Sequence, residues 1–514
     1  MECILVFDIG TTSLKTVIFD CHGKELGSVS RRYPTSYPGA GMAEQQPEDF
    51  WNAAVDGVRD LTARDVLEGK RLEVIGLTGH MNGCLLVDSE GIPVYPELIH
   101  ADSRSTDQCR RLLEVIPHRE IYRRTGNRVD EHLSLPKLLW IRDHQEDAYN
   151  RTAWFLNSKD YLRFKLTGIL GESDYSDASL TGALDITAKR WDRELITEVG
   201  LSPDIFPSLV KSTDITGTLS REAALILGLP EGVPVSGGGG DAACSTRGAG
   251  VTTSRQAYGS IGSSAWISTL AEHPVYDDQM RMQNFYDIDG EHCNICGTVQ
   301  NAGAAVDWVL GLFYPGEGRS NDEYRAIEDS LRRIPPGSKG VLFLPYLMGE
   351  RTPHWDAAAR GAFVGLSLLH SRETMVRAVY EGVAFALRDI MDVYQDLSMD
   401  LDSFTLLGGG VRSEVWRSII STVVGIPMAL HRIPTHAASL GAALGAGVGA
   451  GIWSSLDEAA SLPLTGEVIE PDREQQADYD RIHLIYRDLY GHLKPAFESL
   501  AQVRAAGEQT KRSS

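Results

Sequence analysis

The segment of residues 4–13, ILVFDIGTTS, decides the architecture that the rest of the chain follows. Its apolar start predicts a buried strand, and a second apolar run at 14–19 predicts another strand directly after the small-residue turn. A turn at 21–24 then leads into a third strand that runs through Val29. Three short strands with tight turns leave no room for helices, so the N-terminus is predicted to form an antiparallel meander.

Helical patterns follow at 49–63 and 105–115, with a strand-like stretch at 74–77 between them. This mixture of strands and helices predicts an α/β fold with a mixed sheet. At 514 residues the chain is too long for one ordinary core, and length alone suggests roughly two to four domains.

A second hairpin of the same design occurs near the midpoint of the chain. Residues 256–267, QAYGSIGSSAWI, again place a loop of small residues between two strand-like runs. We therefore predict two related domains, residues 1–250 and 251–514, that face each other across a cleft. Ligands bind preferentially in clefts between domains.

Composition and charge exclude several classes of protein. Hydrophobic residues make up 42% and charged residues 23%, the balance of a soluble globular protein. The formal charge is 49 − 70 = −21, a sign that repels phosphodiester backbones, so nucleic acid is not an expected partner. Apolar runs are far shorter than the roughly 20 residues of a membrane helix, and the N-terminus lacks the basic region of a secretory signal. We expect a cytoplasmic protein.

The seven cysteines do not suggest a disulfide framework. Cys293 and Cys296 have the spacing of a redox pair or of half a zinc site. A zinc site needs about four ligands, and the sequence contains no second Cys-x-x-Cys. We expect no metal or redox role for this pair.

The first loop, DIGTTS at 8–13, has the composition of a phosphate site. Gly, Ser and Thr expose backbone N–H groups and hydroxyls with little bulk, which suits phosphate oxygens. Asp8 ends the strand and is placed to approach a Mg²⁺ ion carried by a nucleotide. The alternative is an ordinary hairpin turn capped by Asp8. The sequence has no Gly-x-x-x-x-Gly-Lys-Ser/Thr motif, so a P-loop is not predicted.

The strongest single segment is VPVSGGGGDAAC at 233–244. A short strand runs into four glycines, and Asp241 follows at the start of a small-residue helix. Phosphoryl transfer requires a carboxylate that orients and deprotonates a hydroxyl, together with an in-line γ-phosphate and Mg²⁺. An aspartate with the ordinary pKa of about 3.9 would already be ionised for this role. Asp241 could equally be a helix N-cap, and the two roles are compatible.

Two later segments extend the pattern. LLGGGVRSEVW at 406–416 repeats the order of strand, glycine turn and helix. HAASLGAALGA at 436–446 is a helix almost without bulk. It offers either a flat surface for a planar base and its ribose or close packing against another helix.

Taken together, these segments resemble the FGGY family of carbohydrate kinases, whose fold pairs two ribonuclease-H-like domains of the actin type. The resemblance runs from Asp8 to about Trp453 and is specific because five motifs occur in the family's order. These motifs are DIGTTS at 8–13, GGGGD at 237–241, GSS at 262–264, FLPYLMGERTP at 343–353 and GGGVRS at 408–413.

The resemblance implies a role for each matching residue, with ATP and Mg²⁺ as cofactors. Asp241 is similar to the family's catalytic base and Asp8 to its metal-associated aspartate. The residues implied in phosphate binding are Gly10, Thr11, Thr12, Ser13, Gly262 and Ser263. Those implied on the adenosine side are Gly409, Gly410 and Ser413. For Glu350 and Arg351 we favour an ion pair that orders a loop over a catalytic role.

Within the family, the chain most resembles the xylulose kinases. GHMNG at 79–83 is similar to their Gly-Gln-Met-His-Gly, and ADSR at 101–104 to their Asn-Asp-Gly-Arg. By this resemblance Met81, Asn82, Asp102 and Asp241 contact the sugar. Asn82 stands where xylulose kinases carry His, and Ala242 where they carry Asn. D-Xylulose or a related ketopentose is the expected substrate, and ribulose, erythritol, glycerol and gluconate remain alternatives.

The expected partner is therefore a small sugar, with no nucleic acid and no membrane. A homodimer is one option for the assembly. Two rival functions use the same fold: a non-catalytic ATP-responsive switch, and a phosphotransferase acting on a carboxylate such as acetate. Neither needs a general base, so Asp241 favours the sugar kinase.

Overall fold

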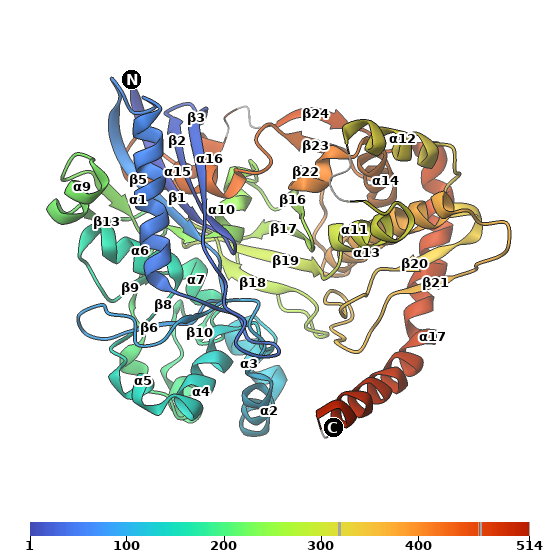
Figure 1. Ribbon diagram of the computed structural model, residues 1–514, viewed down its shortest axis with the longest axis horizontal. Helices are drawn as coiled ribbons and strands as arrows, with labels where there is room; N and C mark the ends of the chain where they lie inside the picture. The colour runs from blue at the N-terminus through green and yellow to red at the C-terminus, as the bar shows by residue number, and fades with distance from the viewer. Residues whose placement is uncertain (317–319, 461, 463–464, 513–514) are drawn as a thin grey trace. The chain divides into compact units, whose positions relative to one another are not determined.

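The computed structural model describes residues 1–316, 320–460, 462 and 465–512, which divide into two compact units (Figure 1). Unit 1 comprises residues 1–253, 270–295 and 436–464, and unit 2 comprises residues 254–269, 296–435 and 465–514. The chain contains two mixed, seven-stranded sheets. The prediction of a two-domain α/β fold is confirmed.

The sheet of unit 1 contains the predicted meander. β1 pairs antiparallel with β2, β2 pairs antiparallel with β3, and β5 lies parallel to β1 on its other side. The strand order is β13-β14-β5-β1-β2-β3, with β15 also paired to β5. The strands are β1 (Glu2–Ile9), β2 (Ser13–Asp20), β3 (Glu25–Arg32), β5 (Arg71–Gly79), β13 (Ile215–Thr218), β14 (Pro234–Ser236) and β15 (Gly239–Gly240).

The helix α1 (Pro47–Ala63) covers one face of this sheet. Alternate residues of a strand point to the same face, so every second side chain of β1 faces this helix. Leu5 and Phe7 of β1 share a buried core with Phe50 and Ala54 of α1. In Figure 1, α1 runs alongside these strands. The helical pattern at 49–63 thus corresponds to α1, and the strand-like stretch at 74–77 lies within β5.

α15 (Ala437–Gly449) packs on β5 and β1, and also against α10 (Asp241–Gly248). The approach leaves no space for side chains: a Cβ atom at Gly76 would lie 2.8 Å from the Ala442 carbonyl oxygen, and one at Gly441 only 1.8 Å from the Cys244 carbonyl oxygen. The small residues at 436–446 therefore serve close packing, the second of the two interpretations given to that segment.

The remainder of unit 1 holds a second core, whose buried side chains include Leu112, Leu138, Ile141 and Leu195. Its other helices are α2 (Thr106–Val115), α3 (His118–Thr125), α4 (Ser134–His144), α5 (Glu146–Arg151), α6 (Ser158–Thr167), α7 (Tyr175–Ser179), α8 (Arg193–Glu198), α9 (Arg221–Leu227) and α16 (Leu456–Ala460). Its short strands are β4 (Glu44–Gln45), β6 (Leu85–Val87), β7 (Glu97–Leu98), β8 (Trp154–Leu156), β9 (Glu172–Asp174), β10 (Leu184–Asp185), β11 (Arg190–Trp191) and β12 (Ser208–Val210).

The second sheet repeats the plan of the first. β16 pairs antiparallel with β17 and parallel with β22, just as β1 pairs with β2 and β5. The similar hairpins predicted from the sequence therefore occupy equivalent places in two related sheets. The strand order is β18-β19-β17-β16-β22-β23-β24. The strands are β16 (Gln256–Ile261), β17 (Ala265–Ala271), β18 (Gln283–Tyr286), β19 (Cys293–Val299), β22 (Ser403–Leu407), β23 (Met428–His431) and β24 (Thr465–Ile469).

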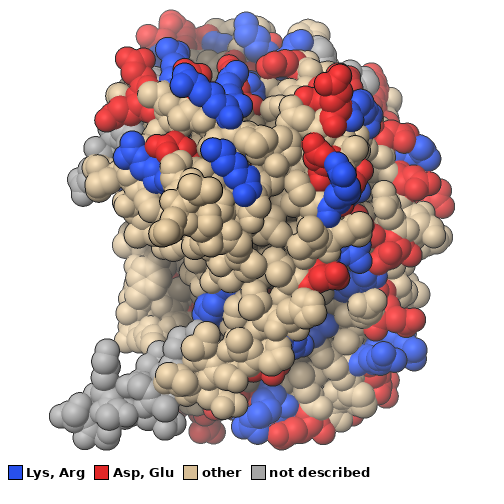
Figure 2. Space-filling model, turned by 90° about the vertical axis from the view of Figure 1, so that its right-hand side faces the viewer, with Lys and Arg blue, Asp and Glu red and all other residues tan. Residues whose placement is uncertain are grey.

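The helices of unit 2 carry most of its remaining residues. They are α11 (Gly303–Phe313), α12 (Asn321–Arg332), α13 (Arg372–Asp396), α14 (Glu414–Val424) and α17 (Arg473–Arg512), and a separate two-stranded sheet joins β20 (Leu342–Leu344) to β21 (Ala362–Val364). Among the described helices, none is long and apolar enough to span a bilayer. On the face drawn in Figure 2, basic side chains lie next to acidic ones.

Cys293 and Cys296 are both buried in β19. Residues three apart on a strand point to opposite faces, so the two thiols cannot act as one ligand pair. Burial raises the pKa of each thiol to about 12, which removes the reactive thiolate near neutral pH.

Candidate active site

Three neighbouring parallel strands of unit 1 end at the same edge of the sheet. β5 is the middle strand, and Gly79 on it is in register with Ile9 of β1 and with Gly240 of β15. The next residues along the three strands are therefore Gly10, His80 and Asp241. Sites in open α/β sheets form at such carboxyl ends.

The glycine run brings Asp241 to this edge through very tight packing. Gly238 has φ +74°, and a Cβ atom there would lie 2.7 Å from the Leu77 carbonyl oxygen. A Cβ atom at Gly240 would lie 2.5 Å from Met81 Cγ. The N-cap of α10 is Gly240, so Asp241 is the first helical residue and not the cap. A carboxylate in the first turn is stabilised by the helix dipole.

Asp241 has the electrostatics of a base that is ionised at neutral pH. Burial raises the pKa of its carboxyl to about 6, an effect that the neighbouring His80 opposes and the Asp8 carboxylate reinforces. The ordinary pKa assumed from the sequence is thus corrected upward. A base with a pKa slightly below the working pH combines ionisation with useful basicity.

Asp8 is buried, and its Oδ2 accepts hydrogen bonds from Lys15 Nζ at 3.2 Å and from Ser439 Oγ at 2.6 Å. Ser439 belongs to α15, so the close packing of that helix also orients this carboxylate. A magnesium ion takes oxygen ligands and is usually held by one or two carboxylates together with water and phosphate oxygens. The Asp8 carboxylate, which interacts electrostatically with Asp241, can supply such an oxygen ligand.

The loop after Asp8 is an ordered hairpin turn. The Gly10 amide donates to the Ser13 carbonyl at 3.0 Å, and the Tyr33 hydroxyl donates to the Gly10 carbonyl. Gln45 Nε2 donates to the Thr11 carbonyl at 2.6 Å. Thr12 is exposed, and Thr11 and Ser13 are half-buried. The structure shows the hairpin turn, with a fixed backbone and accessible hydroxyls, and phosphate binding by this loop stays a prediction.

Met81 and Asn82 follow His80 at the same strand end. Met81 is buried and lies against Gly240, which links the predicted sugar side to the predicted base. Asn82 has φ +66°, the left-handed conformation that asparagine adopts more readily than most residues. The buried Lys137 ammonium donates to the Asn82 carbonyl at 3.0 Å and holds this turn in place.

Asp102 is fully buried, and its carboxylate is engaged within the protein. Arg104 Nη2 lies 2.7 Å from its Oδ2, and the Ala43 amide donates to the same oxygen at 2.6 Å. Arg104 also pairs with Glu44 at 2.8 Å and lies over the Trp140 ring. Asp102 thus positions an arginine, and its contact with the sugar rests on the resemblance alone.

Sequence reasoning did not single out His80 and Glu97, which form a buried pair beside Asp241. His80 Nε2 lies 3.2 Å from Glu97 Oε1, and both side chains are almost inaccessible. His80 Nδ1, Glu97 Oε2 and Ser158 Oγ have no hydrogen-bond partner among the described residues. Buried polar atoms are nearly always satisfied, so such a group indicates where a polar ligand or water binds. No motif marks Glu97, which lies in a loop-like segment of the sequence.

The nucleotide residues predicted in the second half of the chain come together in unit 2. Gly262, Ser263, Gly409, Gly410 and Ser413 all line one cavity of about 800 Å³. Its walls include the aromatic side chains of Tyr324, Tyr380 and Trp416. Ser413 is also the N-cap of α14, where its hydroxyl accepts a hydrogen bond from the Trp416 amide at 3.1 Å. A cavity of this size is in the range of small-molecule sites.

Glu350 is buried and acts as a loop organiser. Its Oε1 accepts backbone N–H bonds from Gln300 at 2.7 Å and from Arg351 at 2.8 Å. Burial raises its pKa to about 8, an effect that these two amides oppose. The contact found between Glu350 and Arg351 is a backbone hydrogen bond and not the expected ion pair, and the loop-ordering role stays a prediction.

Comparison with known proteins now adds to this geometry. Two family models match the chain: the N-terminal domain of the FGGY family of carbohydrate kinases over residues 3–248, and its C-terminal domain over residues 257–450. The chain belongs to the FGGY family of carbohydrate kinases. It is therefore an ATP-dependent sugar kinase, as the motifs predicted.

Among FGGY relatives, the xylulose kinase of Bacillus subtilis is 31% identical over 98% of this chain and all of its own length. The gluconokinase of the same organism is also 31% identical, over 82% of each chain. The solved structure of a xylulose kinase from Lactobacillus acidophilus superimposes with a TM-score of 0.91 at 26% identity, covering 97% of this chain and all of that one.

Proposed function

We propose that this FGGY kinase transfers the γ-phosphate of ATP to a hydroxyl of a ketopentose, with D-xylulose as the first choice. The observation that carries the proposal is the placement of Asp241 next to Asp8 and His80 at one sheet edge. The choice of D-xylulose is supported by the xylulose kinase of Bacillus subtilis, a relative that covers nearly the whole chain.

In the proposed reaction Asp241 orients the sugar hydroxyl and accepts its proton as the oxygen bonds to the γ-phosphorus, while ADP leaves. The raised pKa of Asp241 makes it a stronger base than an ordinary aspartate. Asp8 is the residue proposed to hold magnesium, which supplies charge neutralisation to the phosphates. The hydroxyls of Thr11, Thr12 and Ser13 are proposed to bind phosphate oxygens.

We further propose that the sugar lies over residues 79–83. The unsatisfied atoms His80 Nδ1, Glu97 Oε2 and Ser158 Oγ gather around this turn. A Cβ atom at Gly83 would lie 2.1 Å from Glu97 Oε1, and one at Gly79 would lie 2.9 Å from Ser158 Oγ. Several buried donors and acceptors around one turn suit a substrate that carries several hydroxyls.

A sugar acid is the second candidate, supported by the gluconokinase relative. The departures at Asn82 and Ala242 alter the polar groups that would read the substrate. A buried polar group left unpaired by the wrong sugar costs roughly 1–3 kcal/mol, which changes substrate preference by about 5- to 150-fold.

The test is ADP release from ATP and Mg²⁺ over a panel of D-xylulose, L-xylulose, D- and L-ribulose, glycerol, erythritol and gluconate. We expect the highest kcat/KM with a ketopentose. A clear preference for gluconate or a polyol would overturn the substrate and keep the reaction. Release of ADP with none of these compounds, although ATP binds, would count against this substrate range.

A further inference from the structure

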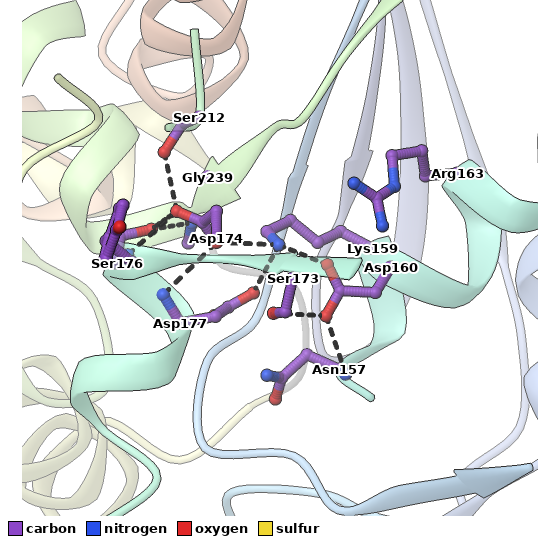
Figure 3. A network of polar contacts seen from close by, with 12 residues as sticks. Asn157, Lys159, Asp160, Arg163, Ser173, Asp174, Ser176, Asp177, Ser212 and Gly239 are labelled. Carbon is purple, nitrogen blue, oxygen red and sulfur yellow. Dashed lines mark hydrogen bonds and ion pairs between the residues drawn. The ribbon is translucent and has the colours of Figure 1, made fainter. Parts of the chain in front are cut away.

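A buried lysine, Lys159, lies at the centre of a cluster of carboxylates that the proposed reaction does not use (Figure 3). Its ammonium lies 2.6 Å from Asp160 Oδ1, 2.8 Å from Asp174 Oδ1 and 3.0 Å from Asp177 Oδ2. All four side chains are completely inaccessible to solvent. Burying charges is costly, and hydrophobic residues of similar volume often give equal stability. Stability alone is therefore a weak explanation for the cluster.

Asp174 connects this cluster to two other segments of unit 1. Its Oδ2 accepts hydrogen bonds from Ser176 Oγ at 2.5 Å and from Ser212 Oγ at 2.6 Å. Burial alone would raise the pKa of Asp174, but the Lys159 ammonium and these hydroxyls bring it below its usual value. Asp174 thus remains an acceptor for both serines.

Both serines hold the glycine run. The Gly240 amide donates to Ser176 Oγ at 2.8 Å, and the Gly238 amide donates to the Ser212 carbonyl at 3.0 Å. Gly240 immediately precedes Asp241. A continuous series of contacts therefore runs from Lys159 through Asp174 and Ser176 to the backbone of the proposed base.

We propose that Lys159, Asp174 and Ser176 form a positioning relay that fixes the backbone before Asp241 and so sets the direction of its carboxylate. The inference rests on the proposed role of Asp241 as the base. Functional groups need support from surrounding hydrogen bonds to keep productive geometry, and the four-glycine run provides none from its own side chains. The Ser176 hydroxyl is the essential link because it accepts from Gly240 and donates to Asp174.

The chain offers a matched pair of variants. Ser176→Ala removes the link to Gly240, whereas Ser173→Ala removes a buried hydroxyl of the same cluster that donates to Asp160 Oδ2 at 2.7 Å. Each substitution removes one hydroxyl that donates to a carboxylate of the cluster, and neither removes Lys159 or a charged group. Asp174 Oδ2 keeps Ser212 Oγ as a donor and Asp160 Oδ2 keeps the Asn157 amide, whereas Ser176→Ala also leaves the Gly240 amide without its acceptor. Each variant should lower the melting temperature by a few degrees, and Ser176→Ala by somewhat more.

Their kinetics should differ. A misplacement of about 1 Å at a reacting group costs up to about 100-fold in rate. We expect Ser176→Ala to lower kcat by about 10- to 100-fold with little change in KM for ATP, and Ser173→Ala to keep kcat within about threefold. Initial rates and melting curves are measured together, with Asp241→Asn as a third variant.

The outcomes separate the two proposals. Loss of turnover in Asp241→Asn with normal kcat in Ser176→Ala would overturn the relay and leave the base intact. Near-normal turnover in Asp241→Asn would overturn the base itself, whatever the serine variants do. Equal losses of kcat in Ser176→Ala and Ser173→Ala would assign the cluster to stability alone.

Discussion

Replacing His80 with glutamine should move the acid limb of kcat/KM to higher pH. The pKa of Asp241 is raised to about 6 by burial, although neighbouring His80 opposes that effect. Burial lowers the pKa of His80, but Glu97 together with the Asp241 and Asp177 carboxylates outweighs burial and raises the pKa of the imidazole above its ordinary value. The positive charge of this ring favours the ionised form of Asp241. Glutamine can still donate to Glu97 but carries no charge, so the pKa of Asp241 should rise further.

The size of this effect in the unmodified protein follows from the shift in the pKa of Asp241. A carboxyl whose pKa moves from 3.8 to about 6 loses about 3 kcal/mol of preference for its ionised form. Because the base must be ionised, kcat/KM should be half of its maximum near pH 6 and about one tenth of its maximum near pH 5. An aspartate with an ordinary pKa would show no such loss above about pH 5.

The assay measures ADP directly by chromatography with the preferred sugar, from about pH 4.5 to 8, so that no coupling enzyme limits the rate. His22→Gln, in an exposed turn, is the control and should leave the limb in place. A rate profile of the unmodified protein that stays flat down to about pH 4.5, or an unmoved limb in His80→Gln, would refute the electrostatic argument.

Three further predictions follow from the packing. Gly240→Ala should lower the free energy of unfolding by about 1–3 kcal/mol and reduce kcat, because the added Cβ atom would overlap Met81. The control is Gly311→Ala on α11, where an added Cβ atom would meet no other atom within 4 Å. This control should be neutral or slightly stabilising in the same denaturation assay. Glu350→Gln should become more stable relative to the unmodified protein as pH rises. A carboxyl with its pKa raised to about 8 stabilises the fold below its unfolded pKa of about 4.3 and loses that contribution as pH rises through 8. Melting temperatures of the two proteins that diverge by a few degrees between pH 6 and 8 would support this, and parallel curves would contradict it. Ser413→Ala should cost about 1 kcal/mol of stability through the lost N-cap of α14. It should also raise KM for ATP and leave KM for the sugar unchanged. An equal rise in both KM values would argue against a nucleotide role for this residue.

The parts of this fold that could be predicted from the sequence are those written in local patterns. The meander follows from apolar runs separated by tight turns, and the second hairpin repeats it in equivalent pairing. The glycine run before Asp241 marks a place where the backbone packs closely, and Gly238 within it has φ +74°, a conformation that few other residues adopt. Such constraints act on adjacent residues, so one sequence is enough to reveal them.

The supporting contacts could not be predicted in this way. His80 meets Glu97 from 17 residues away, and Ser176 meets Gly240 from 64 residues away. Neither pairing has a fixed spacing, because each depends on how distant segments fold onto the sheet. The raised pKa of Asp241 has the same origin, since burial and the Asp8 and His80 charges come from separate strands.

The most direct test of the account is Asp241→Asn, a change that removes the proton acceptor and keeps the shape of the side chain. ADP release with the preferred sugar and ATP binding by calorimetry are measured on the same preparation. The account predicts a fall in kcat of about 100- to 10,000-fold, the range for loss of a general base, with ATP affinity within a few-fold of the unmodified protein. Turnover within a few-fold of normal would contradict it.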